Sequence, residues 1–284
     1  MIPLRITVLA DNCVATRTTR GEHGLCFHLA LGTRRLLFDT GQGFVLEDNA
    51  HALAIDLSAI DTIALSHGHY DHTGGLPLVM AAARAPVTVH LHPDALQLKY
   101  HVGTSSTRSI GMPEAAREAL TRPACRQVRS REPSEIAPGL YCTGEIPRSE
   151  SSAEPTDTFH LDPQGKEVDP LRDDQSLFFD TPDGVVVLLG CAHAGIMAIL
   201  DHVRHLTPNR PIHAILGGMH LGHASVLQLQ GVIEKLQPTM PRLIVPMHCT
   251  GPRATAALWA AFPEACQAGG AGAVFDFNVN QGSF

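Results

Sequence analysis

The strongest chemical signal in the sequence is a run of metal-binding side chains that directly follows a predicted strand, Ile60–Leu65. The run reads Ser-His-Gly-His-Tyr-Asp-His-Thr-Gly-Gly and places four donors within six residues: His67, His69, Asp71 and His72. In an extended segment, residues two apart share a side, so the first two histidines are placed to hold one ion. If the chain then turns into a helix, the aspartate and the last histidine point another way and can hold a second ion. Imidazole suits Zn, Fe, Ni or Mn, and the carboxylate adds a hard oxygen donor.

Two metal ions need more donors than these four, and two later strand ends supply candidates. The predicted strands Val185–Leu189 and Leu243–Val245 lead into Gly-Cys-Ala-His and Pro-Met-His-Cys, which contain Cys191, His193 and His248. Loops that follow strand ends are where α/β proteins place their sites. A thiolate at Cys191 is a good zinc ligand and could bridge two ions. A histidine at one strand end is more often structural, but beside the first cluster the metal interpretation is favoured.

Four further residues are candidates for supporting the chemistry. Asp39 ends a predicted strand and could hold the far nitrogen of a ligand histidine, which would fix its tautomer; capping the turn that follows is the alternative. Glu145 and Arg148 flank a proline, where the guanidinium could bind a phosphate or carboxylate of the substrate or form a loop salt bridge. His220 follows Gly-Gly and is either an acid or substrate contact or a packed histidine. The histidines at positions 23, 28, 51, 90, 101, 160, 202, 205, 213 and 223 are predicted to be surface or packing residues.

The elements that must position these residues alternate between strands and helices in two halves of the chain. Before residue 100 we predict strands at Leu4–Ala10, Leu25–Leu31, Arg35–Asp39, Ile60–Leu65 and Val87–Leu91, and helices at Gly43–Leu53 and Leu76–Arg84. After residue 174 we predict strands at Ser176–Asp180, Val185–Leu189, Ile212–Leu216, Leu243–Val245 and Ala273–Asn278, and helices at Gly195–His205, Ser225–Leu236 and Arg253–Phe262. Each half opens with a hairpin-like β region and continues with β/α alternation. This order favours an α/β fold of two sheets packed face to face with helices outside, a four-layer αββα sandwich.

Between about residues 100 and 174 the periodicity weakens. Eight prolines and the Ser/Glu-rich run Ser149–Glu154 predict loops around one or two short elements. In a compact domain such a stretch is usually a functional insertion or lid, and the part from Glu145 to Arg148 is expected to reach inward. A linker between two domains is the alternative. We therefore predict a single domain over residues 1–284 with an irregular, lid-like insertion.

Composition narrows the classes of function. Of the 284 residues, 44% are hydrophobic, which is enough to bury a sizeable core, and 17% are charged. A net charge of −7 argues against a broad basic surface for nucleic acid. Seven cysteines without a C-x-x-C pair favour a reducing compartment, and neither a signal peptide nor a membrane span is apparent. We expect a cytoplasmic protein that acts on a small molecule, binds neither nucleic acid nor membrane, and is compatible with a homodimer.

The motifs resemble those of the metallo-β-lactamase superfamily. Ser-His-Gly-His-Tyr-Asp-His-Thr-Gly-Gly is similar to its H-x-H-x-D-H signature, Leu37–Gly41 to its preceding strand-end aspartate, and His248 to its last histidine. One branch is closer still, the 7,8-dihydropterin-6-yl-methyl-4-(β-D-ribofuranosyl)aminobenzene 5′-phosphate synthase group. That resemblance extends over most of the chain, through Asp11-Asn12, Thr143–Arg148, Asp174–Ser176, Leu189–Gly195, Gly217–Leu221 and His248–Gly251.

The resemblance implies an αββα fold and a site with one or two metal ions. His67 and His69 would hold the first metal, and the second would be held by Asp71, His72 and His248. Cys191 stands where the superfamily usually has a bridging aspartate. The usual third histidine of the first metal has no match in Gly-Glu-Ile-Pro-Arg; His193 is the candidate to replace it, and His92 is a weaker one.

These residues predict a metal-dependent hydrolase that attacks an ester or phosphoester-type, anionic small molecule with a metal-activated water. Zn, as one or two ions, is the expected cofactor, with Mn, Fe or Mg as alternatives. Asp71 would orient the nucleophile or carry its proton, and His220 is the second catalytic candidate. The alternative is the reaction of the branch, a transferase that condenses a dihydropterin methyl diphosphate with an aminobenzene ribosyl phosphate and releases diphosphate. A redox or metal-sensing protein is disfavoured, because diiron relatives usually carry Glu where this chain has His69.

Overall fold

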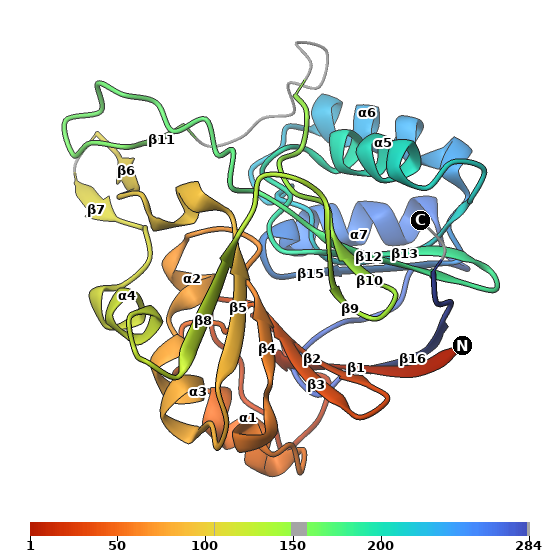
Figure 1. Ribbon diagram of the computed structural model, residues 1–284. Helices are drawn as coiled ribbons and strands as arrows, with labels where there is room; N and C mark the ends of the chain where they lie inside the picture. Colours follow the sequence, from red (N-terminus) through yellow and green to blue (C-terminus); the bar gives the residue numbers. More distant parts are fainter. Residues whose placement is uncertain (105, 149–157, 283–284) are drawn as a thin grey trace.

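The computed structural model describes residues 1–104, 106–148 and 158–282. Two main sheets lie face to face, with helices on the outer side of each (Figure 1). The first sheet has seven strands in the order β16–β1–β2–β3–β4–β5–β8. In that order the strands span Val274–Val279, Ile2–Ala10, Cys26–Leu31, Arg34–Phe38, Thr62–Ala64, Val87–Leu91 and Cys125–Arg129.

The second sheet has six strands in the order β15–β14–β13–β12–β10–β9, and a small third sheet has the order β11–β6–β7. The strands of the second sheet span Leu243–Met247, Ile212–Gly218, Gly184–Leu189, Leu177–Thr181, Leu140–Cys142 and Ser134–Ala137. Those of the third sheet span Phe159–His160, Tyr100–Val102 and Thr107–Ser109. Strands β13, β14 and β15 are parallel, as are β3, β4, β5 and β8. The loops that follow these parallel strands therefore leave each sheet at one edge.

Helices α1 to α4 belong to the first half of the chain and α5 to α7 to the second, and the two groups cover opposite faces of the sandwich (Figure 1). The helices span Leu46–Ala52, Tyr70–Thr73, Leu76–Ala82, Glu114–Leu120, Ile196–Leu206, Val226–Leu236 and Gly251–Ala261. Short 3₁₀ turns lie at Leu57–Ala59 (η1), Pro93–Leu96 (η2), Gln237–Thr239 (η4) and His248–Thr250 (η5). None of the described helices is long and apolar enough to span a membrane.

The buried residues explain the four layers. Strand β13 is apolar at every position after its glycine, since Val186 and Leu188 pack between the sheets while Val185 and Val187 pack toward α5 to α7. A strand buried on both faces loses the alternation of a half-exposed strand and becomes a continuous hydrophobic run. A third apolar cluster fills the space between the first sheet and its own helices. The predicted αββα fold is thus confirmed.

The stretch from about residue 100 to 174 is more ordered than predicted. Its described part holds six strands and helix α4, where one or two short elements were expected. Strand β8 extends the first sheet, and β9 and β10 extend the second. These strands have two to five residues each, which is too short for a period-two pattern to stand out between prolines. The run Ser149–Glu154 lies outside the described residues.

Candidate metal centre and pocket

Three histidines form the first donor group, defined here as His67, His69 and His193. Nε2 of His67 lies 2.9 Å from Nδ1 of His69 and 3.3 Å from Nε2 of His193. The first two follow β4 of the first sheet, and the third follows β13 of the second. All three side chains are buried. The two sheets therefore meet at this group.

The second donor group is Asp71, His72 and His248. Nε2 of His72 lies 3.2 Å from Nε2 of His248, and Oδ2 of Asp71 lies 3.9 Å from the His72 nitrogen and 3.4 Å from the His248 nitrogen. Helix α2 begins at Tyr70, as predicted, and carries Asp71 and His72. Strand β15 delivers His248, where the backbone takes a left-handed φ of 49°.

Cys191 lies between the two groups. Its Sγ atom is 3.1 Å from Nε2 of His72, and it also forms a compact donor set with His67 and His72 in which all ligand atoms are within 4.8 Å. The next residue, Ala192, has a left-handed φ of 58°. Such a conformation costs about 1 kcal/mol or more in a non-glycine residue and is concentrated at functional sites. Here it turns the chain sharply between Cys191 and His193.

Burial and neighbouring charges set the protonation states of these groups. Burial lowers the pKa of His69 to about 3 and holds the pKa of His67 and His193 well below the usual range. Burial also opposes the charging of His72, but Asp39 and Asp71 outweigh it and raise the pKa of His72 to about 9. The first donor group is therefore neutral at pH 7, as metal-binding imidazoles must be, whereas His72 would release its proton when an ion binds.

The donor set fits zinc or a similar ion. Neutral imidazole nitrogens, a thiol and a carboxylate that converge in a buried space are the ligands zinc prefers. Nδ1 of His193 and Nε2 of His69 have no hydrogen-bond partner within the described parts of the chain. The ligand atoms of the first donor group lie within 4.8 Å of one another, and those of the second lie within 3.9 Å, so each group fits one ion.

Outer contacts hold the ligand rings in place. Oδ2 of Asp39 lies 2.7 Å from Nδ1 of His72, and the same carboxylate accepts from the backbone N and the Oγ of Ser66, each at 2.7 Å. Nδ1 of His248 lies 2.8 Å from Oδ1 of Asn12, and the backbone N of His248 donates to Asp11 at 2.8 Å. Each of these contacts fixes a ring orientation, which is the usual role of residues behind metal ligands.

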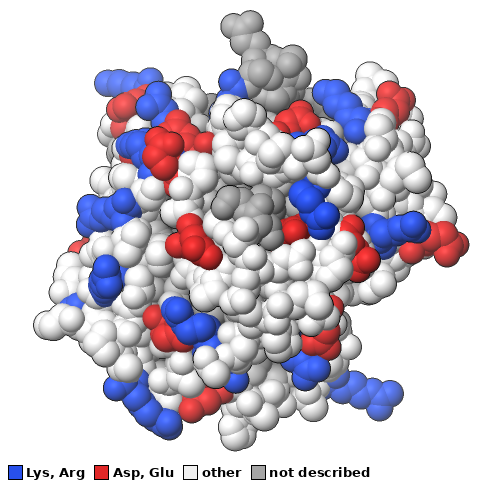
Figure 2. Space-filling view, turned by 45° about the vertical axis from the view of Figure 1, so that its right-hand side comes forward, with Lys and Arg blue, Asp and Glu red and all other residues white. Residues whose placement is uncertain are grey.

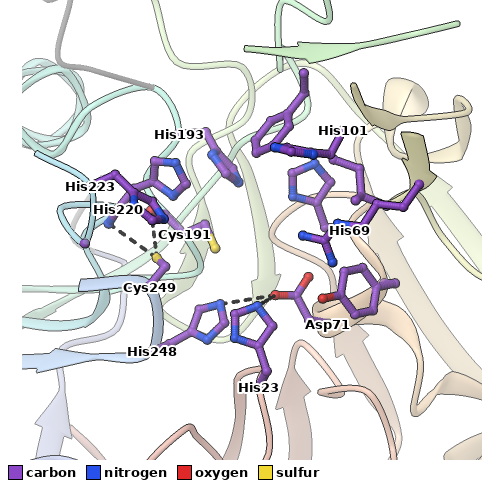
Figure 3. Close-up of a pocket in the computed structure, with 15 residues that line it drawn as sticks. His23, His69, Asp71, His101, Cys191, His193, His220, His223, His248 and Cys249 are labelled. Atoms are coloured by element: carbon purple, nitrogen blue, oxygen red, sulfur yellow. Dashed lines mark hydrogen bonds and ion pairs between the residues drawn. The ribbon is translucent and has the colours of Figure 1, made fainter. Parts of the chain in front are cut away.

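A pocket with a cavity of about 350 Å³ opens above the donor groups. Figure 3 shows the histidines, Asp71 and the two thiols pointing into this shared space from both sides. The small third sheet forms one wall, with His101 from β6, Arg108 from β7 and Phe159 from β11. The guanidinium carbon of Arg108 lies 6.0 Å from the ring centre of Tyr70. The wall thus combines a cation with aromatic faces.

The structure brings together all seven predicted metal ligands, and it places Asp39 behind them. His220 also lines the pocket, with its ring centre 4.3 Å from that of His193. The weaker candidate His92 is elsewhere, because its Nδ1 accepts from the backbone N of Asp94 at 3.1 Å in turn η2.

The expectation that Glu145 and Arg148 reach into the site is not met by their positions. Glu145 pairs with Arg131 at 3.3 Å, and Arg148 is exposed and donates to the carbonyl of Leu171 at 2.9 Å. Neither residue lines the pocket. Both therefore form contacts within the loops, as the alternative interpretation predicted. An irregular segment carries no periodicity from which the direction of its side chains can be predicted.

Three histidines and one cysteine of the pocket were missed by sequence reasoning, which had assigned the histidines to the surface or to packing: His23, His101, His223 and Cys249. Nε2 of His23 lies 3.1 Å from Oδ2 of Asp71, although its sequence neighbours carry no motif. Cys249 accepts from the backbone N of His220 at 3.3 Å and lies with Cys191 and His248 in one donor set. Its position directly after His248 was a signal that could have found it.

The family model of the metallo-beta-lactamase superfamily matches residues 19–206, so the chain belongs to this superfamily. The resemblance identified from the motifs is thereby confirmed. The fold agrees, because the superfamily's solved structures share it over nearly the whole chain.

Three relatives show how far the similarity extends. The chain is 28% identical over 265 residues, 90% of each protein, to 7,8-dihydropterin-6-methyl-4-(beta-D-ribofuranosyl)-aminobenzene-5'-phosphate synthase of Methanocaldococcus jannaschii. It is 31% identical over 247 residues to an uncharacterized protein of the same archaeon, which covers 87% of this chain and 90% of that one. The crystal structure of Tm1679, described as a metal-dependent hydrolase of the beta-lactamase superfamily, superposes with a TM-score of 0.81 at 30% identity and covers 98% of this chain and 100% of its own.

Proposed function

We propose that the protein is a metal-dependent hydrolase that cleaves an ester or phosphoester-type bond in a small anionic molecule. The observation that carries this proposal is the convergence of two donor groups on Cys191 directly beneath an open pocket. When bound there, one or two ions would supply a Lewis acid and lower the pKa of water toward about 7. A substrate in the pocket would then lie next to both the Lewis acid and the activated water.

The chain's own residues have separate roles in this proposal. Hydrogen bonds and charge from His72, His23 and His248 outweigh burial and hold the pKa of Asp71 well below its ordinary value, so its ionised carboxylate would accept a hydrogen bond from the attacking water. His220, which lines the opposite wall of the pocket, would donate a proton to the leaving oxygen. Arg108 would bind an anionic group of the substrate, in place of Arg148.

The transferase reaction is the second candidate, because the synthase from Methanocaldococcus jannaschii is similar over 90% of the chain. Two phosphate-bearing substrates would need several cations. Among the residues described around the pocket, Arg108 is the single Lys or Arg, and on the face shown in Figure 2 basic and acidic side chains are interspersed over the described residues. This scarcity of positive charge at the pocket favours one anionic group and therefore the hydrolase.

The test separates the two reactions on one protein. Protein purified without added metal is loaded with Zn²⁺ or Mn²⁺ and assayed with phosphoesters, lactones and thioesters in ¹⁸O-labelled water. Hydrolysis predicts one ¹⁸O atom in the product and no requirement for a second substrate. The transferase would replace the hydrolase if two results are found together. Diphosphate would be released only when a dihydropterin methyl diphosphate and an aminobenzene ribosyl phosphate are both present, and the other substrates would neither be cleaved nor take up ¹⁸O.

A further inference from the structure

Two adjacent buried carboxylates reach the two loops that carry the first donor group. Oδ2 of Asp173 accepts from the backbone N of Gly68, the residue between His67 and His69, at 2.8 Å. Oδ2 of Asp174 accepts from the backbone N of Ala194, directly after His193, also at 2.8 Å. The relative exposures of the two aspartates are 0% and 2%. One short segment therefore connects a loop of the first sheet to a loop of the second.

The next residue fixes the same segment to the strand end before the histidines. The side-chain amide of Gln175 donates to the carbonyl of Leu65 at 2.8 Å, and its backbone N donates to the carbonyl of Ser66 at 2.9 Å. Gly68 packs closely against η2, because a Cβ there would lie 2.1 Å from the carbonyl oxygen of Ala95. The loop of the first two ligands is thus held on both sides by the main chain and by Asp173.

A buried lysine, Lys99, balances the negative charge of Asp173. Nζ of Lys99 lies 2.9 Å from Asp173 and 2.6 Å from Asp169, and its side chain is fully buried. An unpaired ammonium at this depth would be strongly destabilising, so the two carboxylates are what allows it to be buried. Lys99 directly precedes β6, and the backbone N of Asp169 donates to the carbonyl of Phe159 at 2.8 Å. The same ion-paired cluster therefore supports the pocket wall.

We propose that Asp173 and Asp174 are positioning residues that set the distance between His193 and the pair His67 and His69, with Lys99 holding Asp173 in place. Their bonds go to the backbone of the first donor group. The second donor group is held by a different set of residues: Asp39, Asp11 and Asn12. Loss of a residue behind a metal ligand typically weakens metal binding by about 10- to 100-fold. Replacing Asp173 or Asp174 should therefore weaken binding of the ion at the first donor group and leave binding at the second donor group unchanged.

Two single-site backgrounds make this selectivity measurable. His248→Ala keeps the first donor group intact, and His69→Ala keeps the second. Asp173→Asn is added to each, and the Zn²⁺ dissociation constant is measured by competition with a chromophoric chelator. We expect Zn²⁺ binding to weaken about 10- to 100-fold in the His248→Ala background and to stay unchanged in the His69→Ala background. Equal weakening in both, or none in the first, would overturn the proposal.

Two controls separate positioning from general loss of stability. Asp180→Asn removes another buried, ion-paired carboxylate, bonded to Arg210 at 2.7 Å in strand β12, and Asp169→Asn breaks the other half of the Lys99 pair while keeping the bond to Gly68. Both should lower the melting temperature and leave Zn²⁺ binding unchanged. If Asp173→Asn does not fold, Asp174→Asn must show the same selective loss through Ala194, and unchanged Zn²⁺ binding there would equally overturn the proposal.

The inference rests on the metal centre of the proposed function and not on its reaction. A protein that binds Zn²⁺ with the expected selectivity but cleaves none of the substrates would refute the hydrolase alone. Conversely, active hydrolase with equal Zn²⁺ binding in the Asp173→Asn and parent proteins would refute the positioning role alone.

Discussion

Asp39→Asn is the sharpest test of how the second donor group is organised. With Nε2 of His72 directed at the metal, its Nδ1 carries the hydrogen and donates to Oδ2 of Asp39 at 2.7 Å, while Oδ1 accepts from the backbone N of Ser66 at 2.7 Å. An asparagine offers one oxygen and one NH₂ group. Whichever way the amide turns, either His72 or the backbone of Ser66 faces a donor in a fully buried site.

The magnitude follows from that mismatch. A buried donor left without its acceptor costs about 1–3 kcal/mol, and a hydrogen bond to a charged group is worth about 1.5–3 kcal/mol. At 1.4 kcal/mol per tenfold, we expect Zn²⁺ binding to weaken roughly 10- to 100-fold. Isothermal titration of chelator-treated protein measures this change. Asp61→Asn is the control, because Asp61 bonds Arg34 at 2.7 Å at the far end of β4 from the donors. Zn²⁺ affinity equal to that of the parent protein would refute the assignment of Asp39 as the residue that fixes His72.

Arg108→Ala should raise KM for an anionic substrate in steady-state kinetics and leave the metal content unchanged. Arg148→Ala, at an exposed position outside the pocket, should change neither quantity. The reverse pattern would restore Arg148 as the anion contact. Cys191 and Cys249 should resist iodoacetamide in the metal-loaded protein and react after chelation, with exposed Cys13 labelled in both states; equal labelling of Cys191 in both states, read by peptide mass mapping, would place it outside the metal shell. Burial, with a smaller contribution from Arg35, lowers the pKa of His28 from 6.5 to about 4, so the unfolded chain takes up a proton that the folded one does not. The free energy of unfolding of the parent protein, measured with urea relative to that of His28→Gln, should therefore fall by about 3 kcal/mol as the pH falls from 6.5 to about 4. A free-energy difference between the two proteins that does not change with pH would contradict this.

The sequence could indicate the candidate donors because they sit at strand ends, and the structure brings their side chains together. His67, Cys191 and His248 each follow an apolar run that ends at a glycine or a short polar motif, and such a run fixes where the strand stops and which edge it faces. Asp71 and His72 could be assigned to a separate ion because the change from extended chain to helix rotates their side chains. Local rules were sufficient wherever the chain was regular.

The pocket wall could not be predicted in the same way. His101 and Phe159 lie on strands of three and two residues, and Arg108 lies on another of three. Their pairing is decided by contacts far apart in sequence, such as Phe159 opposite His101, and no periodicity marks it. His23 shows the same limit, because a residue between Gly21 and Gly24 in an irregular segment gives no indication that it will meet Asp71 in space.

The second donor group has a consequence for how the protein is made. Its nitrogen atoms on His72 and His248 lie 3.2 Å apart but are separated by 176 positions along the chain. On the ribosome, the first strands and α2 emerge long before β15 is synthesised, so a nascent chain carries Asp71 and His72 without their partner. Full metal binding would therefore wait until β15 has been synthesised. An ion bound at that stage would join α2 to β15, and it would stabilise the folded protein because the unfolded chain has no such site to offer it.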